Sequence, residues 1–359
     1  MTLQIYVRNV DIIRFEYMVD TYFIAEVGLN HNGDIELAKK LVETAIECKS
    51  DAIKFQKRNV NQMATRDILD KPFTNFPSFG STYREIREHL ELTFNEYKEL
   101  IDLCKGRIDF IVTPFDIQSL EFLDKLDIDA LKIASHNMTD IPLIEEIAKR
   151  QLPVYMSTGM CSMSDIELSV DILDPNKERI IGSENPLCIM HCISQYPSPA
   201  KYANLRMVSI LRDKYPNHLI GFSDHQNGFH LPPAALSLGA TVFEKHFTLN
   251  HTFEGFDHVF SLEPGALKKC IRNIRETADA LEYHEKMPME YEMNAFNDYK
   301  RSVVSTRNIP KGTVITRDML TTKAPNRGLS PKLIPSIVGM TASKDIEEDT
   351  HITYDVIES

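Results

Sequence analysis

The chain has 359 residues, of which 43% are hydrophobic and 26% are charged, a composition typical of a folded globular protein. Its net charge of −12 argues against nucleic acid or an anionic membrane as the main partner, and no apolar run reaches the roughly 18 residues that a membrane helix needs. Six scattered cysteines form no zinc motif, and residues 1–20 lack the apolar core of a signal peptide, so we expect a reduced cytoplasmic protein.

Short apolar runs alternate with segments of helical spacing over residues 22–283. The runs occupy residues 22–28, 51–56, 108–115, 129–135, 152–159, 187–194, 219–225 and 241–247. Eight strand–helix units over roughly 260 residues favour a (β/α)8 TIM barrel over an open doubly wound sheet. We therefore predict an α/β protein whose barrel domain spans residues 1–283.

The pattern changes after the predicted barrel domain. Residues 284–300 are polar, are interrupted by Pro288 and show no clear period, so we predict a linker there. Residues 301–359 carry short runs rich in Thr and Val around a Pro-Lys-Gly turn. Such runs and turns are typical of a small β-rich domain.

Polar side chains lie at the carboxyl ends of all eight predicted strands. Parallel barrel strands are buried on both faces, and the active sites of TIM barrels lie at the carboxyl ends of the strands. Residues two apart on a strand share a face. These strand-end residues are Glu26, Lys54, Gln56, Thr113, Lys132, Ser135, Ser157, Ser194, Tyr196, Ser223, His225, Glu244 and His246. Each has an ordinary explanation alone, but a polar end on every strand points to one shared site.

The chemistry of this set suits a metal-assisted reaction on a phosphorylated anion. Two lysines and several hydroxyl groups form a site for phosphate or carboxylate. His225 and His246, on neighbouring strands, could hold a divalent metal ion that keeps positions open for water and substrate. Glu26 is then the candidate acid or base. Among the other groups, His31 could shape the mouth, and we expect Cys188 and Cys192 in the core.

A series of segments follows the chain in order. They are "AEVGLNHNGD" (25–34), "KFQ" (54–56), "VTPFD" (112–116), "STGM" (157–160), "HCISQYP" (191–197), "GFSDH" (221–225), "EKHFT" (244–248) and "GFDHVFSLEPG" (255–265). Together they resemble the sialic acid synthase family, which includes N-acetylneuraminate synthase and the related pseudaminic and legionaminic acid synthases. Residues 301–359, with "IPKGTVIT" and "LIPSIVGM", are similar to that family's antifreeze-like SAF domain.

The resemblance implies a reaction and an assembly. The reaction is the condensation of phosphoenolpyruvate (PEP) with an open-chain N-acetylated aldose, which yields a nine-carbon 2-keto acid and phosphate. A divalent metal, Mn2+ or Mg2+, orients the aldehyde. The assembly is a domain-swapped homodimer in which each SAF domain covers the partner's barrel mouth.

The resemblance also implies roles for individual residues. The metal ligands are His225 and His246. The PEP-binding groups are Lys54, Lys132, Ser135, Ser157, Ser194 and Ser223. The catalytic groups are Glu26, Asp257 and Tyr196. The groups around the sugar are Gln56, Thr113, Phe115, Asn137 and Arg327.

Two departures from the family's pattern leave the sugar open. After Lys132, the family has Gly-Ser-Gly followed by an acid, whereas this chain places His136 at a glycine position and Asn137 at the acidic one. An amide still hydrogen-bonds a sugar hydroxyl, but without charge. In the SAF domain, Ala324 replaces an arginine that reaches the partner's site, and Arg327 could substitute for it. The candidates are N-acetylmannosamine, its 6-phosphate and the diacetamido sugars of pseudaminate and legionaminate synthesis.

Two other classes of function use these residues less well. A metal-dependent barrel hydrolase has no need of two lysines and a row of serines, and it would require more His or Asp ligands. A non-enzymatic role, with the SAF domain binding sugar or ice, leaves the polar end of every strand unexplained.

Overall fold

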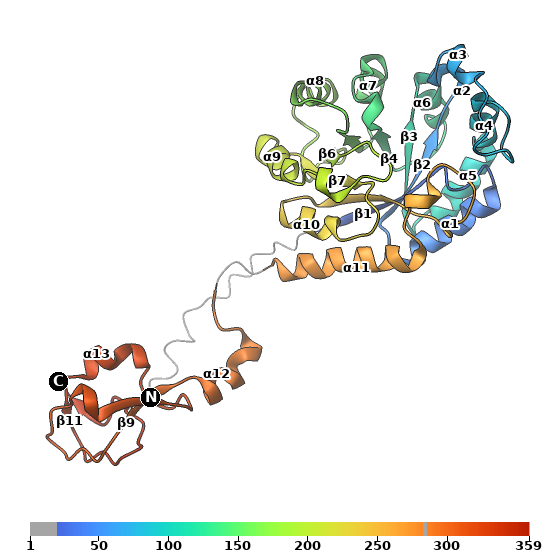
Figure 1. Cartoon of the computed structure of the whole chain (residues 1–359). Helices are drawn as coiled ribbons and strands as arrows, with labels where there is room; N and C mark the ends of the chain where they lie inside the picture. Colours follow the sequence, from blue (N-terminus) through green and yellow to red (C-terminus); the bar gives the residue numbers. More distant parts are fainter. Residues whose placement is uncertain (1–19, 283–285, 359) are drawn as a thin grey trace. The chain divides into compact units, whose positions relative to one another are not determined.

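The structure is a computed structural model that describes residues 20–282 and 286–358. The expectations for residues 1–19, 283–285 and 359 lie outside this part of the chain. The described residues divide into two compact units, 20–282 and 286–358, and each folds around a core of its own (Figure 1). Among the helices of the described residues, none is long and apolar enough to cross a membrane.

The first unit is a closed barrel of eight parallel strands in sequence order (Figure 1). The strands are β1 (Tyr22–Gly28), β2 (Ala52–Lys57), β3 (Asp109–Pro114), β4 (Ala130–Ile133), β5 (Val154–Ser157), β6 (Leu187–Cys192), β7 (Leu219–Asp224) and β8 (Val242–His246). The barrel closes at β1, where Glu26 is level with Lys54 on β2 and with His246 on β8. The predicted TIM barrel is confirmed.

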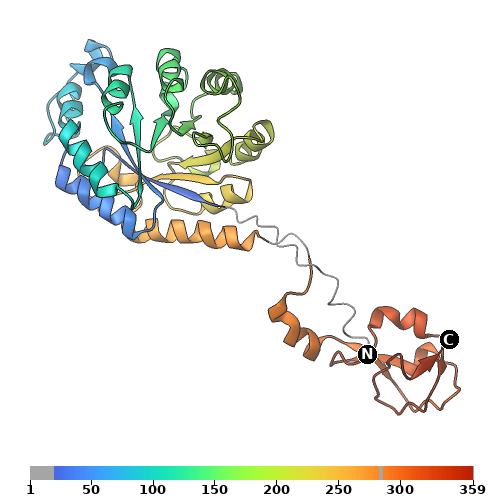
Figure 2. The same cartoon turned by 180° about the vertical axis from the view of Figure 1, so that it is seen from behind.

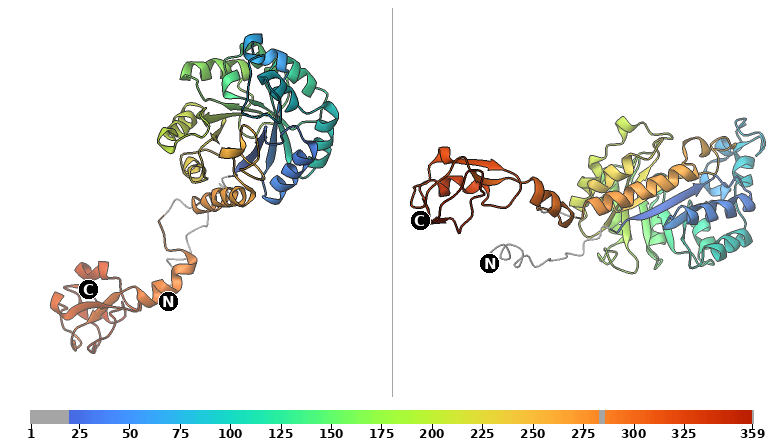
Figure 3. Two further views of the ribbon diagram at one scale, coloured as in Figure 1. Left: turned by 45° about the vertical axis from the view of Figure 1, so that its right-hand side comes forward. Right: turned by 90° about the horizontal axis from the view of Figure 1, so that it is seen from below.

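Helices surround the strands as an outer ring (Figure 3, left). They are α1 (Ile35–Glu47), α2 (Val60–Met63), α3 (Arg66–Leu69), α4 (Tyr83–His89), α5 (Phe94–Cys104), α6 (Ile117–Leu123), α7 (Ile141–Ala148), α8 (Met163–Leu173), α9 (Arg206–Lys214), α10 (Leu231–Ser237) and α11 (Pro264–Ala280). Short 3-10 turns are η1 (Ser135–Asn137), η2 (Ala200–Tyr202) and η3 (His258–Phe260). Helix α11 lies beside α1, where Cys48 Sγ is 3.4 Å from Pro264 O, so the ring closes with the barrel (Figure 2).

Inward-facing side chains change from apolar to polar along the strands. Near the amino ends, Ile24 and Val242 belong to an apolar cluster. Two residues further on, the same faces carry Glu26 and Glu244, both buried. On the opposite face, Phe243 packs in the large core between strands and helices. The barrel therefore has an apolar floor and a polar mouth.

The second unit is small and β-rich, as predicted. Its strands are β9 (Ser302–Ser305), β10 (Leu320–Lys323), β11 (Thr341–Ala342) and β12 (Ile357–Glu358), in two antiparallel pairs. Its helical elements are η4 (Glu290–Glu292), α12 (Met293–Tyr299), η5 (Arg317–Met319), η6 (Pro331–Leu333) and α13 (Ile334–Ile337). Isoleucine and valine side chains form its core, Val303, Ile309, Ile315 and Ile352 among them.

Helix α12 lies within residues 284–300, where the sequence shows no period. None of its seven residues is buried. A helix that buries no face needs no apolar stripe, so a search for the helical period does not detect it.

Candidate active site

A cavity of about 330 Å³ lies at the carboxyl ends of the barrel strands. Its lining contains fourteen of the predicted site residues, which come from all eight strands and the segments that follow them. They are Glu26, Lys54, Gln56, Thr113, Phe115, Lys132, Ser135, Ser157, Ser194, Tyr196, Ser223, His225, His246 and Asp257. The expected convergence of strand ends on one site is therefore present in the structure.

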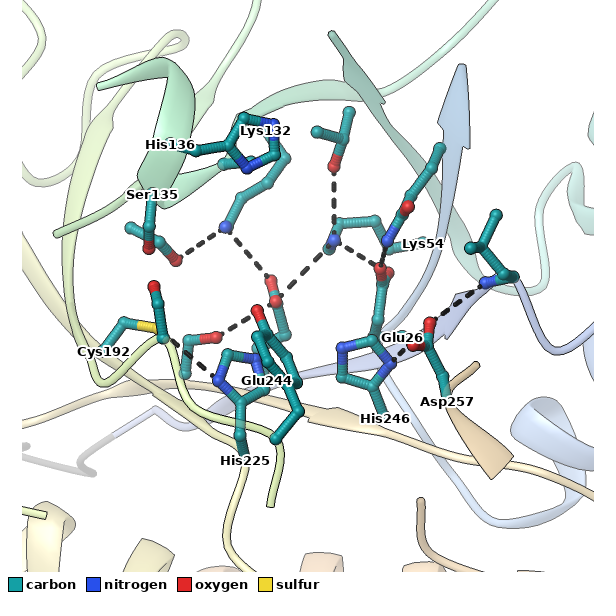
Figure 4. A pocket seen from close by; sticks show the side chains of 18 of the residues that line it. Glu26, Lys54, Lys132, Ser135, His136, Cys192, His225, Glu244, His246 and Asp257 are labelled. Atoms are coloured by element: carbon teal, nitrogen blue, oxygen red, sulfur yellow. Dashed lines mark hydrogen bonds and ion pairs between the residues drawn. The ribbon is translucent and has the colours of Figure 1, made fainter. Parts of the chain in front are cut away.

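Buried carboxylates and ammonium groups alternate across the cavity floor (Figure 4). Lys54 Nζ lies 2.7 Å from Glu26 Oε2 and 3.7 Å from Glu244 Oε1. Lys132 Nζ lies 3.7 Å from Glu244 Oε2. Burial alone would lower the pKa of Lys54, but Glu244 and Glu26 outweigh it and the pKa is raised. The two carboxylates thus keep the buried Lys54 side chain positively charged.

The sequence analysis places Glu244 among the strand-end residues of the shared site without a specific role, and the structure shows that it is central here. Burial raises a carboxyl pKa, but Lys132 and Lys54 outweigh burial and lower the pKa of Glu244, which keeps it ionised. Its Oε1 also accepts a hydrogen bond of 3.1 Å from Ser223 Oγ. The signal available in the sequence is its place two residues before His246 on one strand face.

Glu26 has the opposite tendency, because burial raises its pKa above the usual range. Gln56 Nε2 donates a 2.5 Å hydrogen bond to its Oε1. The Glu26 carboxyl group therefore lies between an amide donor and the Lys54 ammonium group. A proton can be exchanged between Glu26 and Lys54.

Hydroxyl groups line the side of the cavity near Lys132. Ser157 Oγ accepts a 2.6 Å hydrogen bond from Lys132 Nζ, and Ser135 Oγ accepts one of 3.0 Å from the Gly159 backbone N–H. Ser194 Oγ is buried without a partner among the described residues. A Cβ at Gly159 would lie 2.3 Å from Ser194 Oγ, so only glycine fits against these hydroxyls. The buried, unpaired hydroxyl marks a place where a ligand oxygen can bind.

His225 and His246 face each other with their ring centroids 5.5 Å apart (Figure 4). Nδ1 of His225 lies 2.9 Å from the carbonyl oxygen of Ile193, a contact that places the proton on Nδ1 and frees Nε2. Burial lowers the pKa of His246 to about 3, so this ring is neutral, and its Nδ1 is buried without a hydrogen bond. Burial lowers the pKa of His225 as well, but the neighbouring Cys192 outweighs burial and the pKa is raised. Each ring offers a nitrogen to a divalent metal, and on His225 the metal would displace a proton.

The protein would supply few ligands to such a metal. Within residues 20–282 and 286–358, no group of three His, Cys, Asp or Glu side chains is arranged around one point. Two imidazoles would therefore leave most coordination positions to water and substrate. The residues present fit a metal of this open kind.

Cys192 is buried, as expected, but it also borders the cavity. Its Sγ lies 3.8 Å from His225 Nδ1. Cys188 and Cys192 share one face of β6. Cys192 lies four residues further on, at the carboxyl end of the strand, where the inward face is polar. Cys188 belongs to the apolar floor, as expected.

Tyr196 and Asp257 border the histidines. The Tyr196 ring centroid lies 4.1 Å from that of His225, and the residue is half exposed. Asp257 Oδ2 lies 3.6 Å from His246 Nδ1 and accepts a 3.4 Å hydrogen bond from the Leu29 backbone N–H. Gly28 has φ +56°, and a Cβ there would lie 2.8 Å from Asp257 Oδ2. A glycine is required to hold the loop of Asp257 this close.

One predicted sugar-site residue of the first unit does not line the cavity. Asn137 is buried, and its Nδ2 donates a 3.3 Å hydrogen bond to the backbone oxygen of Phe115. The neighbouring His136 lines the cavity instead, with its ring stacked 4.9 Å from that of Phe115. Arg327 belongs to the second unit.

Other polar groups of the first unit have structural contacts. His31 is buried outside the cavity lining, and its Nδ1 accepts a 3.1 Å hydrogen bond from Gly33 N–H. His191 faces the helix layer, where its Nε2 lies 2.7 Å from the carbonyl oxygen of Ala203.

Several cavity residues carry no role in the sequence prediction, and two of them are arginines. Arg58 follows Lys54 and Gln56 on one strand face, so alternation could have identified it. Arg87 lies on α4, in the long connection between β2 and α5, where no strand-end rule applies.

Comparison with known proteins places this site in a family. The sequence model described as the NeuB family matches residues 41–286, and that of the SAF domain matches residues 300–358. The chain belongs to the NeuB family. The resemblance to sialic acid synthases and to their SAF domain is confirmed.

Relatives of this NeuB-family enzyme share most of its length. The N-acetylneuraminate-9-phosphate synthase of Mus musculus is 37% identical over 94% of this chain and 93% of its own. The N,N'-diacetyllegionaminic acid synthase of Campylobacter jejuni is 34% identical over 92% of this chain and 98% of its own. A crystal structure of N-acetylneuraminic acid synthetase from Leptospira borgpetersenii, in complex with citrate, is 32% identical with a TM-score of 0.65, covering 77% of this chain and 90% of that one.

Proposed function

We propose that the protein is a nonulosonate synthase that condenses PEP with an open-chain N-acetylated aldose, either N-acetylmannosamine or its 6-phosphate. The observation that carries the proposal is the alternating row of Glu26, Lys54, Glu244 and Lys132 below two facing histidines. This row combines an anion site, a proton-exchanging pair and a metal position in one cavity.

The proposed chemistry forms one carbon–carbon bond and breaks one carbon–oxygen bond. The methylene carbon of PEP attacks the aldehyde carbon, and the aldehyde oxygen takes up a proton to become a hydroxyl group. Water then adds to C2 of the former PEP and loses a proton. Inorganic phosphate leaves from C2 and the ketone remains, so the products balance PEP, aldose and water.

Lys54 and Lys132 bind the anionic groups of PEP in this proposal. Both ammonium groups are buried, and charge-assisted hydrogen bonds are strong where water is excluded. The unpartnered Ser194 hydroxyl and the neighbouring Ser135 supply further hydrogen bonds to phosphate.

Mn2+ or Mg2+ would be held by His225 and His246, and when bound it acts as a Lewis acid on the aldehyde. Glu26, with its raised pKa, accepts one proton of the water that adds at C2 and passes it through Lys54 to the departing phosphate. The other proton of that water replaces the one taken up by the aldehyde oxygen. Asp257, beside His246, lies at the aldehyde end of the sugar in this proposal. Tyr196 covers the histidine rings from the solvent side.

Gln56, Thr113 and Phe115 form the wall for the sugar in this proposal. We also propose a domain-swapped homodimer in which Arg327 of the second unit reaches the acceptor. The similarity of residues 300–358 to the SAF domain supports this part.

The alternative acceptors are the diacetamido sugars used by legionaminic and pseudaminic acid synthases. The Campylobacter jejuni legionaminic acid synthase is nearly as similar to this chain as the mouse enzyme, so a synthase of this kind remains the second candidate. A metal-dependent hydrolase is the remote candidate, since it would not need the buried lysines.

The test is phosphate release from PEP over a panel of aldoses with Mn2+ or Mg2+. The panel contains N-acetylmannosamine, its 6-phosphate and the two diacetamido sugars. We expect release only when an N-acetylated aldose and the metal are both present. Release without any aldose would contradict the synthase and favour the hydrolase.

A further inference from the structure

Two arginines line the cavity and have no part in the proposed chemistry. Arg58 is only 6% exposed, its Nη1 has no hydrogen-bond partner, and the nearest carboxylate oxygen, Glu91 Oε1, is 3.9 Å away. On α4, Nε and Nη1 of Arg87 are likewise buried without a partner among the described residues. Buried charged donors without acceptors are unfavourable, so these groups indicate a missing anion.

Aromatic rings hold both guanidinium groups in place. The Arg58 guanidinium carbon lies 3.9 Å from the centroid of the Phe115 ring. That of Arg87 lies 4.5 Å from the Phe256 ring and 4.8 Å from the Tyr83 ring. Stacking on rings fixes the planes of the guanidinium groups. Nη2 of Arg58 donates a hydrogen bond to Gln56 Oε1, while Nη1 of Arg58 and Nε and Nη1 of Arg87 remain unpaired among the described residues, an arrangement suited to phosphate.

The two arginines also act on each other. Burial, and then the charge of Arg87, lower the pKa of Arg58 to about 10. Like charges placed close together in a buried site destabilise the empty protein, and a bound dianion removes the repulsion. Of their cationic neighbours in the lining, Lys54 and Lys132 have Glu26 and Glu244 as counter-charges on the floor.

We infer that Arg58 and Arg87 form a second anion subsite, which binds the phosphate of a phosphorylated N-acetylated aldose at the end remote from its aldehyde. The inference rests on the proposed function. The floor lysines and serines already provide for the anionic groups of PEP, whereas the arginines lie on the segment after β2 and on α4. A phosphate accepts paired hydrogen bonds from guanidinium groups, which a sugar hydroxyl does not match in strength.

The test compares N-acetylmannosamine with its 6-phosphate, using the full chain with Mn2+ and saturating PEP. The quantity measured is the ratio of kcat/KM for the phosphorylated sugar to kcat/KM for the free sugar. We expect the native enzyme to prefer the phosphorylated sugar and Arg87→Gln to lower the ratio by roughly tenfold to a hundredfold, the loss expected for charge-assisted hydrogen bonds. Arg87→Lys keeps the positive charge but loses the paired N–H donors of the guanidinium group, so it should lower the ratio less than Arg87→Gln does.

Arg84→Gln is the matched control. Arg84 lies on the same helix, pairs with Asp70 at 2.7 Å and is absent from the cavity lining, so the ratio should not change. The melting temperature of each variant checks its folding.

Separate outcomes bear on separate claims. A native preference for the free sugar, or an unchanged ratio in Arg87→Gln, would overturn the subsite and leave the synthase standing. Absence of phosphate release with every aldose would overturn the proposed function, and the subsite with it.

Discussion

Glu244 lies between the ammonium groups of Lys54 and Lys132, 3.7 Å from each. Its carboxylate is therefore the shared counter-charge of two lysines that are buried with it. Without it, Lys54 would keep Glu26 alone as its counter-charge, and the buried Lys132 ammonium group would lose the carboxylate 3.7 Å away. The positions of both buried lysines thus depend on one side chain of β8.

Substitution Glu244→Gln tests this dependence. We expect the free energy of unfolding to fall by about 3 kcal/mol, because removing one partner of a buried ion pair leaves uncompensated charge. Turnover should fall by roughly a hundredfold or more, since misplaced lysines no longer orient PEP. Urea unfolding and initial rates at saturating PEP measure the two effects. Glu276→Gln, at an exposed carboxylate of α11, is the control, and equal behaviour of the two variants would refute the central role of Glu244.

The two facing histidines predict loss of metal binding on substitution. His225→Ala and His246→Ala should each weaken Mn2+ binding, followed by calorimetry, and abolish metal-dependent turnover. His191→Gln is the matched control, because His191 faces the helix layer and bonds the Ala203 carbonyl. Native Mn2+ affinity in either alanine variant would remove the metal assignment.

The left-handed backbone at Gly28 and its contact with Asp257 predict that substitution of this glycine lowers both stability and kcat. Gly28→Ala adds backbone strain of about 1–2 kcal/mol and forces Asp257 Oδ2 away from its position 2.8 Å from the new Cβ. We expect both lower stability and a strong loss of kcat.

Gly106→Ala isolates the strain from the contact. Gly106 has φ +71°, and nothing lies within 4 Å of its added Cβ. It should lose similar stability and keep native kcat. If Gly28→Ala also kept native kcat, Asp257 would have no positional role in turnover.

His31 predicts a pH dependence of stability. Burial, and then Arg58, lower the pKa of His31 to about 3, below the usual value of about 6.5 in an unfolded chain. The unfolded chain therefore binds the proton first, so this stability is complete above pH 6.5 and is lost as the pH falls towards 3. At pH 5 the loss is about 2 kcal/mol from this one group.

His31→Asn keeps an acceptor for Gly33 N–H and removes the titration. Urea unfolding at several pH values between 7 and 5 should show a shallower decline for this variant than for the native chain. His89→Asn, at an exposed histidine, is the control. If the free energy of unfolding of His31→Asn fell with pH as steeply as that of the native chain, the His31 ring would not be held neutral in the folded protein.

Strand alternation explains how much of the site could be predicted from the sequence. A polar residue on the inward face of a buried strand needs a partner in the barrel, so Glu26, Lys54 and His246 were visible as inward-facing polar positions at the strand ends. Arg87 was not, because it comes from α4, whose place depends on the tertiary path between β2 and α5. Asn137 was predicted at the site but does not line it. It lies in a 3-10 turn after β4, where the strand period no longer holds, and its side chain points to the backbone oxygen of Phe115.

The barrel could be predicted from the repeated alternation of apolar runs and helical segments, whereas helix α12 could not. Eight alternating runs were sufficient to predict the barrel, because each strand must bury both faces. Helix α12, which buries no residue, left no period to detect.

The source of the oxygen in the released phosphate tests the central claim most directly. The measurement is mass spectrometry of the products formed from PEP, N-acetylmannosamine or its 6-phosphate, and Mn2+ in water enriched in oxygen-18. If water adds at C2 and the carbon–oxygen bond breaks, the phosphate carries no label and a nine-carbon 2-keto acid accumulates in equal amount. Labelled phosphate together with pyruvate would show simple hydrolysis of PEP and contradict the synthase.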